Sequence, residues 1–244
     1  MTNDQIVGVI GSGSFGTAIS NVLSKNRKVL LYSRRQEVVD SIIETGEHKG
    51  KILSENIIPT NDLEEIAKSC SVIFPIVPAA NFRGMMKEIS PFLKPYHILI
   101  HGTKGLDSPS PSLPKGKGEN LRICTPLPLG GVVGGLPLCR EQVRTMSEVI
   151  LEESVVKRVG CFSGPNLARE LNDNQLAATV VASKFDEVIK EGQKALANQR
   201  FKVYGSYELT GIELAGALKN VIAIASGALN GLGYGENAKA MLLS

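Results

Sequence analysis

Short apolar runs alternate along the chain with amphipathic stretches, which is the pattern of strands connected by helices. Because parallel strands need a crossover between them, this alternation predicts an α/β protein with a mainly parallel sheet. The predicted strands cover residues 6–10, 28–32, 72–77, 98–101, 156–162, 179–182 and 201–204. The predicted helices cover residues 16–25, 36–45, 62–69, 78–89, 141–152 and 185–198, another begins over 165–171, and 46–61 is predicted as a loop. Pro75 cannot donate to a ladder, so we expect an edge position, a bulge or an early end for its strand.

A G-x-G-x-x-G sequence joins the first predicted strand to the first helix. In such a turn Gly11 permits the tight bend, Gly13 allows close approach of a pyrophosphate, and Gly16 allows the helix to pack near the strand. The exposed N–H groups and the positive end of the helix suit phosphate charge. Because the motif lies inside a β-α-β unit, it predicts a Rossmann-like dinucleotide site, with a tight turn that binds no ligand as the alternative.

The pattern changes after residue 206. Residues 212–229 are apolar, rich in alanine and free of turn signals, and a second helix is predicted to start near Asn237. We predict a dinucleotide-binding domain over residues 1–206, with a Pro/Gly-rich surface insertion at about 108–138. Residues 207–244 are predicted to begin an all-helical substrate domain, which is incomplete because so few helices bury little surface.

The end of the second predicted strand carries Ser33, Arg34 and Arg35. An NAD site usually has an acidic residue about 20 residues after the glycines, where it binds the ribose hydroxyls. Here a hydroxyl and two guanidinium groups stand in that region, and guanidinium forks bind phosphate oxygens. We therefore predict that NADP is accepted as well as NAD. Two solvated arginines on a turn are the alternative.

Three further positions carry candidate chemistry. Lys104 follows a strand end, where ligands bind in open α/β sheets. Asn166 lies in a strand-to-helix turn whose N–H groups suit an anion. Lys219 lies in an apolar helix, and desolvation there would lower its pKa to suit acid/base work. The residues that share its face are Ala215, Gly216, Ile222 and Ala223. The alternative for Lys104 is a solvated surface lysine, and for Asn166 a capped helix start. The alternative for Lys219 is a lysine at the helix edge whose charged end reaches solvent.

Bulk properties exclude several classes. The net charge of +3 does not argue for nucleic acid or an anionic membrane. No apolar stretch reaches the length of a membrane span, and the start lacks a secretory signal, so a cytoplasmic protein is expected. The scattered cysteines predict neither a disulfide frame nor a zinc site, and we expect no metal. His97 and His101 flank an apolar strand and are predicted as strand ends that touch solvent.

Four segments, in this order, resemble NAD(P)-dependent sn-glycerol-3-phosphate dehydrogenase of the soluble bacterial type: residues 10–18, 103–105, 163–165 and 213–223. The resemblance implies reduction of dihydroxyacetone phosphate to sn-glycerol 3-phosphate for glycerophospholipid synthesis. It also implies that the family continues beyond Ser244, with an acidic catalytic partner and a Ser-Arg-Asn stretch that holds the substrate phosphate.

The same resemblance implies roles for single residues. Lys219 looks like the proton donor or acceptor at the substrate oxygen, and Lys104 like the lysine near both cofactor and substrate. Positions similar to cofactor contacts are Ser14, Phe15, Arg34 and Ala168, and positions similar to substrate contacts are Gly164 and Asn166. Bacterial members usually carry Ser or Thr where Asn166 stands.

Two other functions remain open at the level of sequence. One is a related two-domain dehydrogenase that acts on a hydroxy acid. The other is a nucleotide-binding fragment without catalysis. The apolar face of residues 212–229 is also compatible with self-association into a homo-oligomer.

Overall fold

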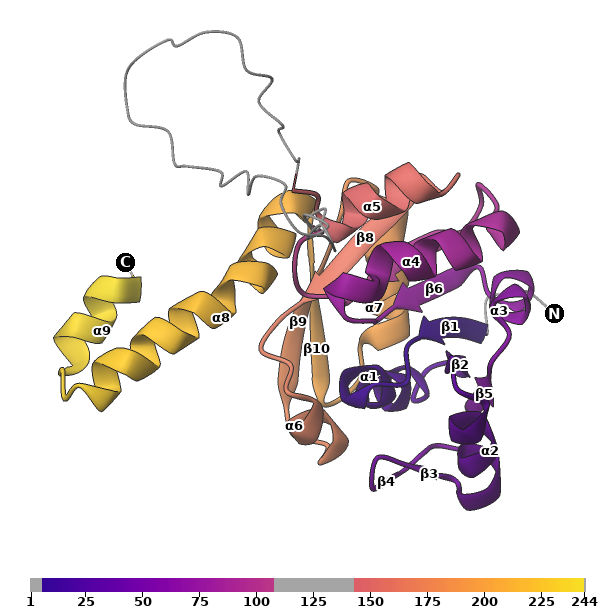
Figure 1. Cartoon of the computed structure of the whole chain (residues 1–244), viewed down its shortest axis with the longest axis horizontal. Helices are drawn as coiled ribbons and strands as arrows, with labels where there is room; N and C mark the ends of the chain where they lie inside the picture. The colour runs from indigo at the N-terminus through magenta and orange to yellow at the C-terminus, as the bar shows by residue number, and fades with distance from the viewer. Residues whose placement is uncertain (1–5, 108–142, 244) are drawn as a thin grey trace, which may run out of the picture. The chain divides into compact units, whose positions relative to one another are not determined.

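The computed structural model describes residues 6–107 and 143–243, and its main feature is an eight-stranded sheet (Figure 1). The strand order is β10-β9-β8-β7-β6-β1-β2-β5. The strands are β1 (Ile6–Ile10), β2 (Lys28–Tyr32), β5 (Ile57–Thr60), β6 (Val72–Pro75), β7 (Ile98–His101), β8 (Arg158–Ser163), β9 (Ala177–Ser183) and β10 (Phe201–Ser206). Only β8 and β9 pair antiparallel in this sheet, so the predicted mainly parallel, Rossmann-like fold is confirmed.

Helices cover both faces of the sheet. They are α1 (Ser14–Leu23), α2 (Gln36–Thr45), α3 (Leu63–Ser69), α4 (Ala79–Ile89), α5 (Met146–Glu153), α6 (Ala168–Asn172), α7 (Asp186–Leu196), α8 (Leu209–Gly231) and α9 (Glu236–Leu243), with a 3₁₀ turn η2 (Ser90–Phe92). One buried cluster joins the sheet to α1, α2, α6 and α7, and a second joins it to α3, α4 and α5. The sheet is therefore doubly wound, as parallel strands with helical crossovers require.

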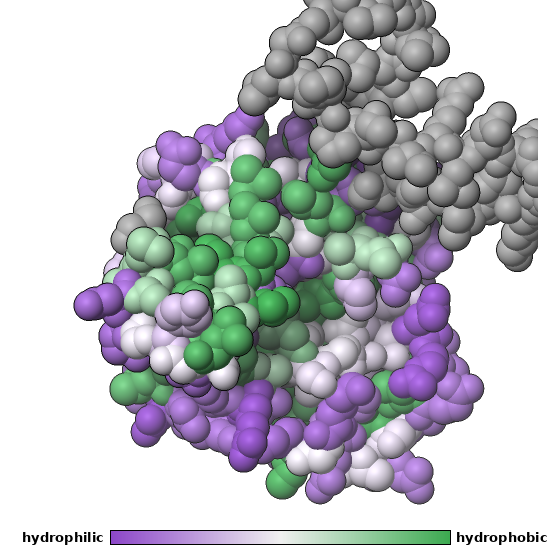
Figure 2. Space-filling view, turned by 60° about the vertical axis from the view of Figure 1, so that its left-hand side comes forward, coloured by the Kyte–Doolittle hydropathy of each residue, from purple (hydrophilic) through white to green (hydrophobic). Residues whose placement is uncertain are grey.

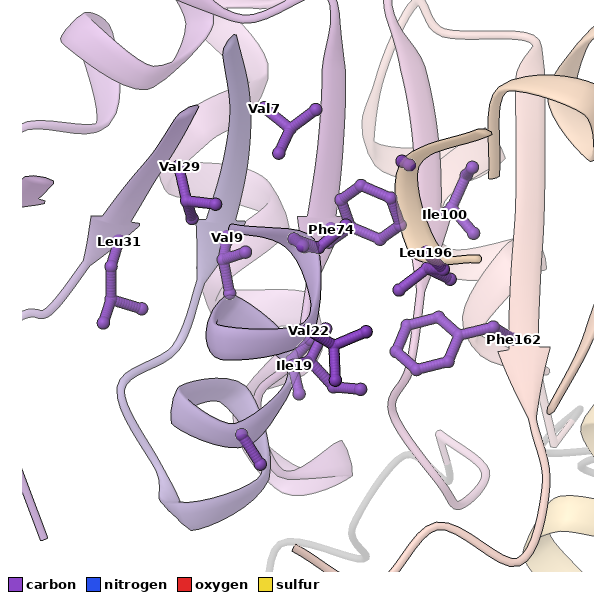
Figure 3. Packing of buried hydrophobic residues seen from close by; sticks show 14 of the residues in the cluster. Val7, Val9, Ile19, Val22, Val29, Leu31, Phe74, Ile100, Phe162 and Leu196 are labelled. Carbon is purple, nitrogen blue, oxygen red and sulfur yellow. The ribbon is translucent and has the colours of Figure 1, made fainter. Parts of the chain in front are cut away.

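Alternation along the strands assigns side chains to the two faces. Val7 and Val9 of β1 and Ile100 of β7 belong to the cluster under α1 and α7, where Phe74 and Phe162 also lie (Figure 3). The intervening residues of the same strands point to the opposite cluster. Strands buried on both faces are apolar at nearly every position, which is why these segments could be recognised from sequence.

Local signals explain where several helices begin. The Asp62 carboxylate accepts hydrogen bonds from the N–H groups of Glu64 (2.7 Å) and Glu65 (3.2 Å), so it caps α3. The helix predicted from residue 141 begins instead at Met146. There the Thr145 hydroxyl accepts from the N–H of Glu148, and the Glu148 carboxylate accepts from the N–H of Thr145. This reciprocal capping box fixes the start of α5.

One other sequence prediction needs correction. The segment predicted as a loop over residues 46–61 contains a hairpin, β3 (Glu47–His48) and β4 (Lys51–Ile52), and the sheet strand β5. Pro59 is tolerated in β5 because this strand lies at the sheet edge. Pro75 is the last residue of β6, so of the three expected solutions the strand takes an early end. The insertion predicted at 108–138 lies outside the described residues.

Helix α8 packs its first turns on β8 and β9, with Leu209, Glu213 and Gly216 buried. Beyond them, large apolar residues of α8 and α9 are exposed (Leu218, Val221, Ile222, Ile224, Met241). Figure 2 is turned so that the side of the molecule with α8 and α9 comes forward, and it shows hydrophobic residues gathered on that surface. α8 is long and apolar enough to cross a membrane, which corrects the expectation that no apolar stretch reaches that length. Core helices of soluble proteins, which are mostly buried, meet the same criteria, whereas 11% of the apolar window of α8 is buried.

Candidate functional site

The glycine-rich loop follows the carboxyl end of β1 and lies beside the end of β2. Gly11 has φ 123°, a left-handed conformation that L side chains rarely adopt, and its N–H donates to the Tyr32 carbonyl at 3.2 Å. Gly13 is the N-cap of α1, so the first N–H groups of the helix lie open beyond it. The chain crosses from β2 and β5 on one side of β1 to β6 on the other, and ligands bind at such a switch point.

A pocket of about 390 Å³ opens beside this loop. Its lining includes Gly11, Gly13, Arg34 and Arg35, so the structure brings the predicted glycines and arginines together. Both arginines are exposed, whereas Ser33 is buried and its hydroxyl accepts from the Ser12 hydroxyl at 2.9 Å. The arginines are therefore the groups free to meet an anion here.

Lys104 follows β7 and lies over the Phe15 ring, with its ammonium 5.4 Å from the ring centroid. Burial, and then the nearby Lys219 ammonium, lower the pKa of Lys104 to about 8. The neighbouring Thr103 hydroxyl donates to the Val77 carbonyl at 2.8 Å, which ties this loop to the end of β6. Two cations held near each other form a site that an anion would stabilise.

The turn after β8 contributes Gly164 and Asn166. The Asn166 side chain is buried and donates to the Thr179 hydroxyl at 3.1 Å, while its Oδ1 has no partner in the part of the chain that the structure describes. A Cβ on Gly164 would lie 2.5 Å from the Ala178 carbonyl oxygen, so only glycine fits there without a shift. The buried acceptor is a group that a donor on a ligand or a water could satisfy.

Lys219 projects from α8 toward the same turn. Its ammonium donates to the Gly164 carbonyl at 3.0 Å. A hollow of about 360 Å³ is lined by Gly164, Ala215, Gly216 and Lys219. Close packing requires Gly216, because a Cβ there would lie 2.8 Å from the Ser163 hydroxyl. The small residues beside Lys219 thus let its helix approach β8.

The predicted site residues fall into two groups. Lys104, Gly164, Asn166 and Lys219 lie where β7, β8 and α8 meet, and Phe15 joins them through Lys104. The glycine loop and the two arginines line the separate pocket between β1 and α4. Ser14 is the exposed first residue of α1, and Ala168, the first of α6, packs on the core cluster that includes Phe162.

One buried pair was not expected from the sequence. His101 was predicted to touch solvent, yet its side chain is 2% exposed, and its Nε2 lies 2.9 Å from Oε1 of Glu213, which is 4% exposed. His97 is also buried. Its Nε2 lies 2.9 Å from the Ala67 carbonyl oxygen, and its Nδ1 lies 3.0 Å from the Lys94 carbonyl oxygen. Alternation along β7 could have found His101, because it shares a sheet face with Leu99.

A mainly parallel sheet that reverses its strand order beside a glycine-rich turn defines a Rossmann-type α/β protein. Comparison with known families agrees. Residues 6–121 and 129–189 match the family described as NAD-dependent glycerol-3-phosphate dehydrogenase N-terminus, and residues 208–244 match its C-terminus. The chain belongs to the NAD-dependent glycerol-3-phosphate dehydrogenase family.

Individual relatives support this assignment. The chain is 34% identical over 249 aligned residues to glycerol-3-phosphate dehydrogenase [NAD(P)+] of Ectopseudomonas mendocina, and likewise to that of Pseudomonas aeruginosa. Each alignment covers 100% of this chain and 64% of the relative. The chain therefore spans less than two thirds of the length of these relatives.

Solved structures give the same result for the fold. The glycerol-3-phosphate dehydrogenase of Coxiella burnetii has a TM-score of 0.77 at 28% identity, covering 99% of this chain and 66% of that one. The yeast enzyme, at 22% identity, has a TM-score of 0.78 over 98% of this chain and 66% of that one, and shows the fold alone.

Proposed function

We propose that this chain binds NADPH or NADH and takes part in reducing dihydroxyacetone phosphate to sn-glycerol 3-phosphate. The observation that carries the proposal is the convergence of Lys104 and Lys219 at the carboxyl edge of the sheet. The names of the relatives support the reaction and the cofactor. In this account the product feeds glycerophospholipid synthesis in the cytoplasm.

The residues beside the glycine loop fit a dinucleotide. A Cβ on Gly13 would meet nothing within 4 Å, so the space beside the first turn of α1 is open to a pyrophosphate. Arg34 and Arg35 supply exposed guanidinium groups for a 2′-phosphate. When bound, the nicotinamide supplies the hydride, and the protein supplies orientation and electrostatics.

On the substrate side, two ammonium groups stabilise the negative charge that develops on the carbonyl oxygen. Lys219 gives a proton to that oxygen, and Lys104 supports the same charge. The lowered pKa of Lys104, about 8, lets this group exchange a proton near neutral pH. The unpartnered Oδ1 of Asn166 accepts from a substrate hydroxyl.

We also propose the division of the chain into a dinucleotide-binding domain, residues 1–206, and the beginning of a helical substrate domain, residues 207–244. The match of residues 208–244 to the C-terminal family model supports this boundary. The exposed apolar face of α8 and α9 supports the view that further structure completes the substrate domain.

The test is oxidation of NADPH by the chain in the presence of dihydroxyacetone phosphate, with the product identified. We expect sn-glycerol 3-phosphate, and roughly a 10²- to 10⁴-fold lower kcat in Lys219→Met. Lys68→Met, which removes an exposed lysine on α3, is the matched control and should keep full activity. Full turnover by Lys219→Met would overturn the assignment. NADPH binding without oxidation would favour the non-catalytic alternative, and faster turnover of a hydroxy acid would favour the related dehydrogenase.

A further inference from the structure

One buried ion-pairing group lies outside the residues given a chemical role above. The Glu213 side chain is 4% exposed and its Oε1 accepts two hydrogen bonds at 2.9 Å, from His101 Nε2 and from the N–H of Ser147. A buried carboxylate without partners is costly, and these two donors offset part of that cost, while the other oxygen, Oε2, is buried without a partner among the described residues. His101 ends β7, Ser147 lies in the first turn of α5, and Glu213 belongs to α8. A single oxygen atom therefore ties three elements together.

The α5 end of this contact suits a negative charge. The first N–H groups of a helix have no partner within the helix, and the helix dipole is positive there. At the start of α5 the side chains of Thr145 and Glu148 each accept a hydrogen bond from the backbone N–H of the other residue. The Glu213 carboxylate accepts from the backbone N–H of Ser147. Burial raises the pKa of Glu213, but the hydrogen bonds and charge of His101 and the Ser147 N–H hold it below its ordinary value. Glu213 is accordingly a carboxylate at neutral pH.

This contact lies close in sequence to both candidate lysines. Lys104 follows His101 by three residues, and Lys219 follows Glu213 by six, on the same helix. Between Glu213 and Lys219 the helix is held by Gly216, which packs on Ser163. Beyond Lys219 the described part of α8 is mostly exposed. The place of Lys219 relative to Lys104 is thus set by the first turns of α8, where Leu209 and Ile212 pack on Cys161 and Ala182, and Glu213 and Gly216 are the anchors nearest to Lys219.

We propose that Glu213 is a positioning residue that, through His101 and Ser147, holds α8 on the sheet so that Lys219 faces Lys104. The purpose of this arrangement rests on the proposed function, because it matters only if the two lysines act together on one substrate. The placement itself can be measured without turnover.

The measurement is the pKa of Lys104 in the full chain, from the pH dependence of its acetylation rate read by mass spectrometry. In the structure Lys219 is the charged group that acts on Lys104. If Glu213→Ala releases α8, Lys104 is hydrated and loses its cationic neighbour, so its pKa should rise from about 8 toward the ordinary 10.5, by one unit or more. Removing a negative charge without movement would lower the pKa instead. The direction of the shift therefore separates positioning from a direct charge effect.

Three variants complete the design. Glu213→Gln keeps an oxygen that can accept from both donors, so the pKa of Lys104 should not rise. His101→Ala breaks the contact from the other side and should raise it, which provides a second test if Glu213→Ala does not fold. Glu208→Gln removes an exposed carboxylate at the start of the same helix and should change nothing.

A pKa of Lys104 that stays near 8 in folded Glu213→Ala or His101→Ala would overturn the proposal. NADPH titrations on the same samples keep the two proposals apart. If the wild-type chain binds no NADPH, yet the Lys104 pKa rises in Glu213→Ala as expected, the result would contradict the function and support the positioning role.

Discussion

The glycine-rich loop offers a pair of substitutions with opposite expected effects. In Gly13→Ala the new methyl group meets no heavy atom within 4 Å, and the backbone at φ −68° and ψ 172° suits any residue. The reduced freedom of the unfolded chain should raise the free energy of unfolding by about 0.4–1 kcal/mol. Alanine is a poorer N-cap than glycine at the start of α1 and lowers it by a similar amount, about 0.5–1 kcal/mol, so the net change should be small. If a pyrophosphate lies against this backbone, the methyl group must be accommodated at about 1–3 kcal/mol. We expect NADPH affinity to fall roughly 5- to 150-fold.

Gly16→Ala should behave differently. A Cβ there would lie 1.9 Å from the Gly11 carbonyl oxygen, well inside any real contact. The backbone of the turn must move, because Gly11 itself is confined by the Ile76 carbonyl, 2.1 Å from where its own Cβ would lie. Overpacking of this kind costs about 1–3 kcal/mol. Gly16→Ala should thus lose stability and NADPH affinity together, whereas Gly13→Ala loses affinity alone.

Urea unfolding followed by far-UV circular dichroism gives the stability, and quenching or enhancement of NADPH fluorescence gives the affinity. Gly227→Ala in α8, also with nothing within 4 Å of its Cβ, is the control for adding a methyl group to an open position. Unchanged NADPH affinity in Gly13→Ala, or wild-type stability in Gly16→Ala, would show that the reasoning about this turn is wrong.

Three further predictions concern charge. Lys219→Met should raise the pKa of Lys104 above its value of about 8, because one cause of its lowering is removed; an unchanged acetylation profile would contradict this. Lys104→Met should stabilise the chain at pH 7. The pKa of Lys104 is lower in the folded chain (about 8) than the ordinary 10.5. Burial of the charged lysine therefore lowers the free energy of unfolding by its full amount below pH 8, and this loss disappears as the pH rises past 10.5. The full shift equals roughly 3 kcal/mol, which solvent screening of this partly exposed group reduces to about 1 kcal/mol, measurable by urea unfolding at pH 7 and pH 11. Arg34→Asp should weaken NADPH relative to NADH roughly 10- to 100-fold, as loss of a charge-assisted hydrogen bond implies, and equal weakening of both cofactors in binding titrations would refute a 2′-phosphate contact.

Much of the fold follows from local pattern. The helix over Gln36–Thr45 and the strand over Ile98–His101 have the bounds that periodicity predicted, because each buries a regular apolar face. β5 escaped prediction because it is four residues long, contains Pro59 and lies between polar segments. This segment is a strand because it pairs with β2, and the local sequence gives no signal of that pairing.

The candidate site was predictable where backbone conformation dictates the residue type. Gly11 needs a left-handed φ, and Gly216 needs close approach of α8 to β8. The contact of His101 with Glu213 could not be read in the same way, because 112 positions separate the partners, and alternation along β7 indicates that His101 is buried but not which residue it contacts. Long-range polar contacts of this kind depend on how elements pack, and sequence pattern alone places the elements only approximately.

The central proposal is that Lys219 acts at the reacting oxygen beside a bound dinucleotide. The most direct test is a single-turnover experiment, in which excess chain loaded with NADPH is mixed with dihydroxyacetone phosphate and the loss of NADPH is followed. We predict a hydride-transfer phase in the wild-type chain that is at least 100-fold slower in Lys219→Met, although the variant still binds NADPH. Equal rates in the two chains, or no transfer in a wild-type chain that binds both ligands, would contradict the claim.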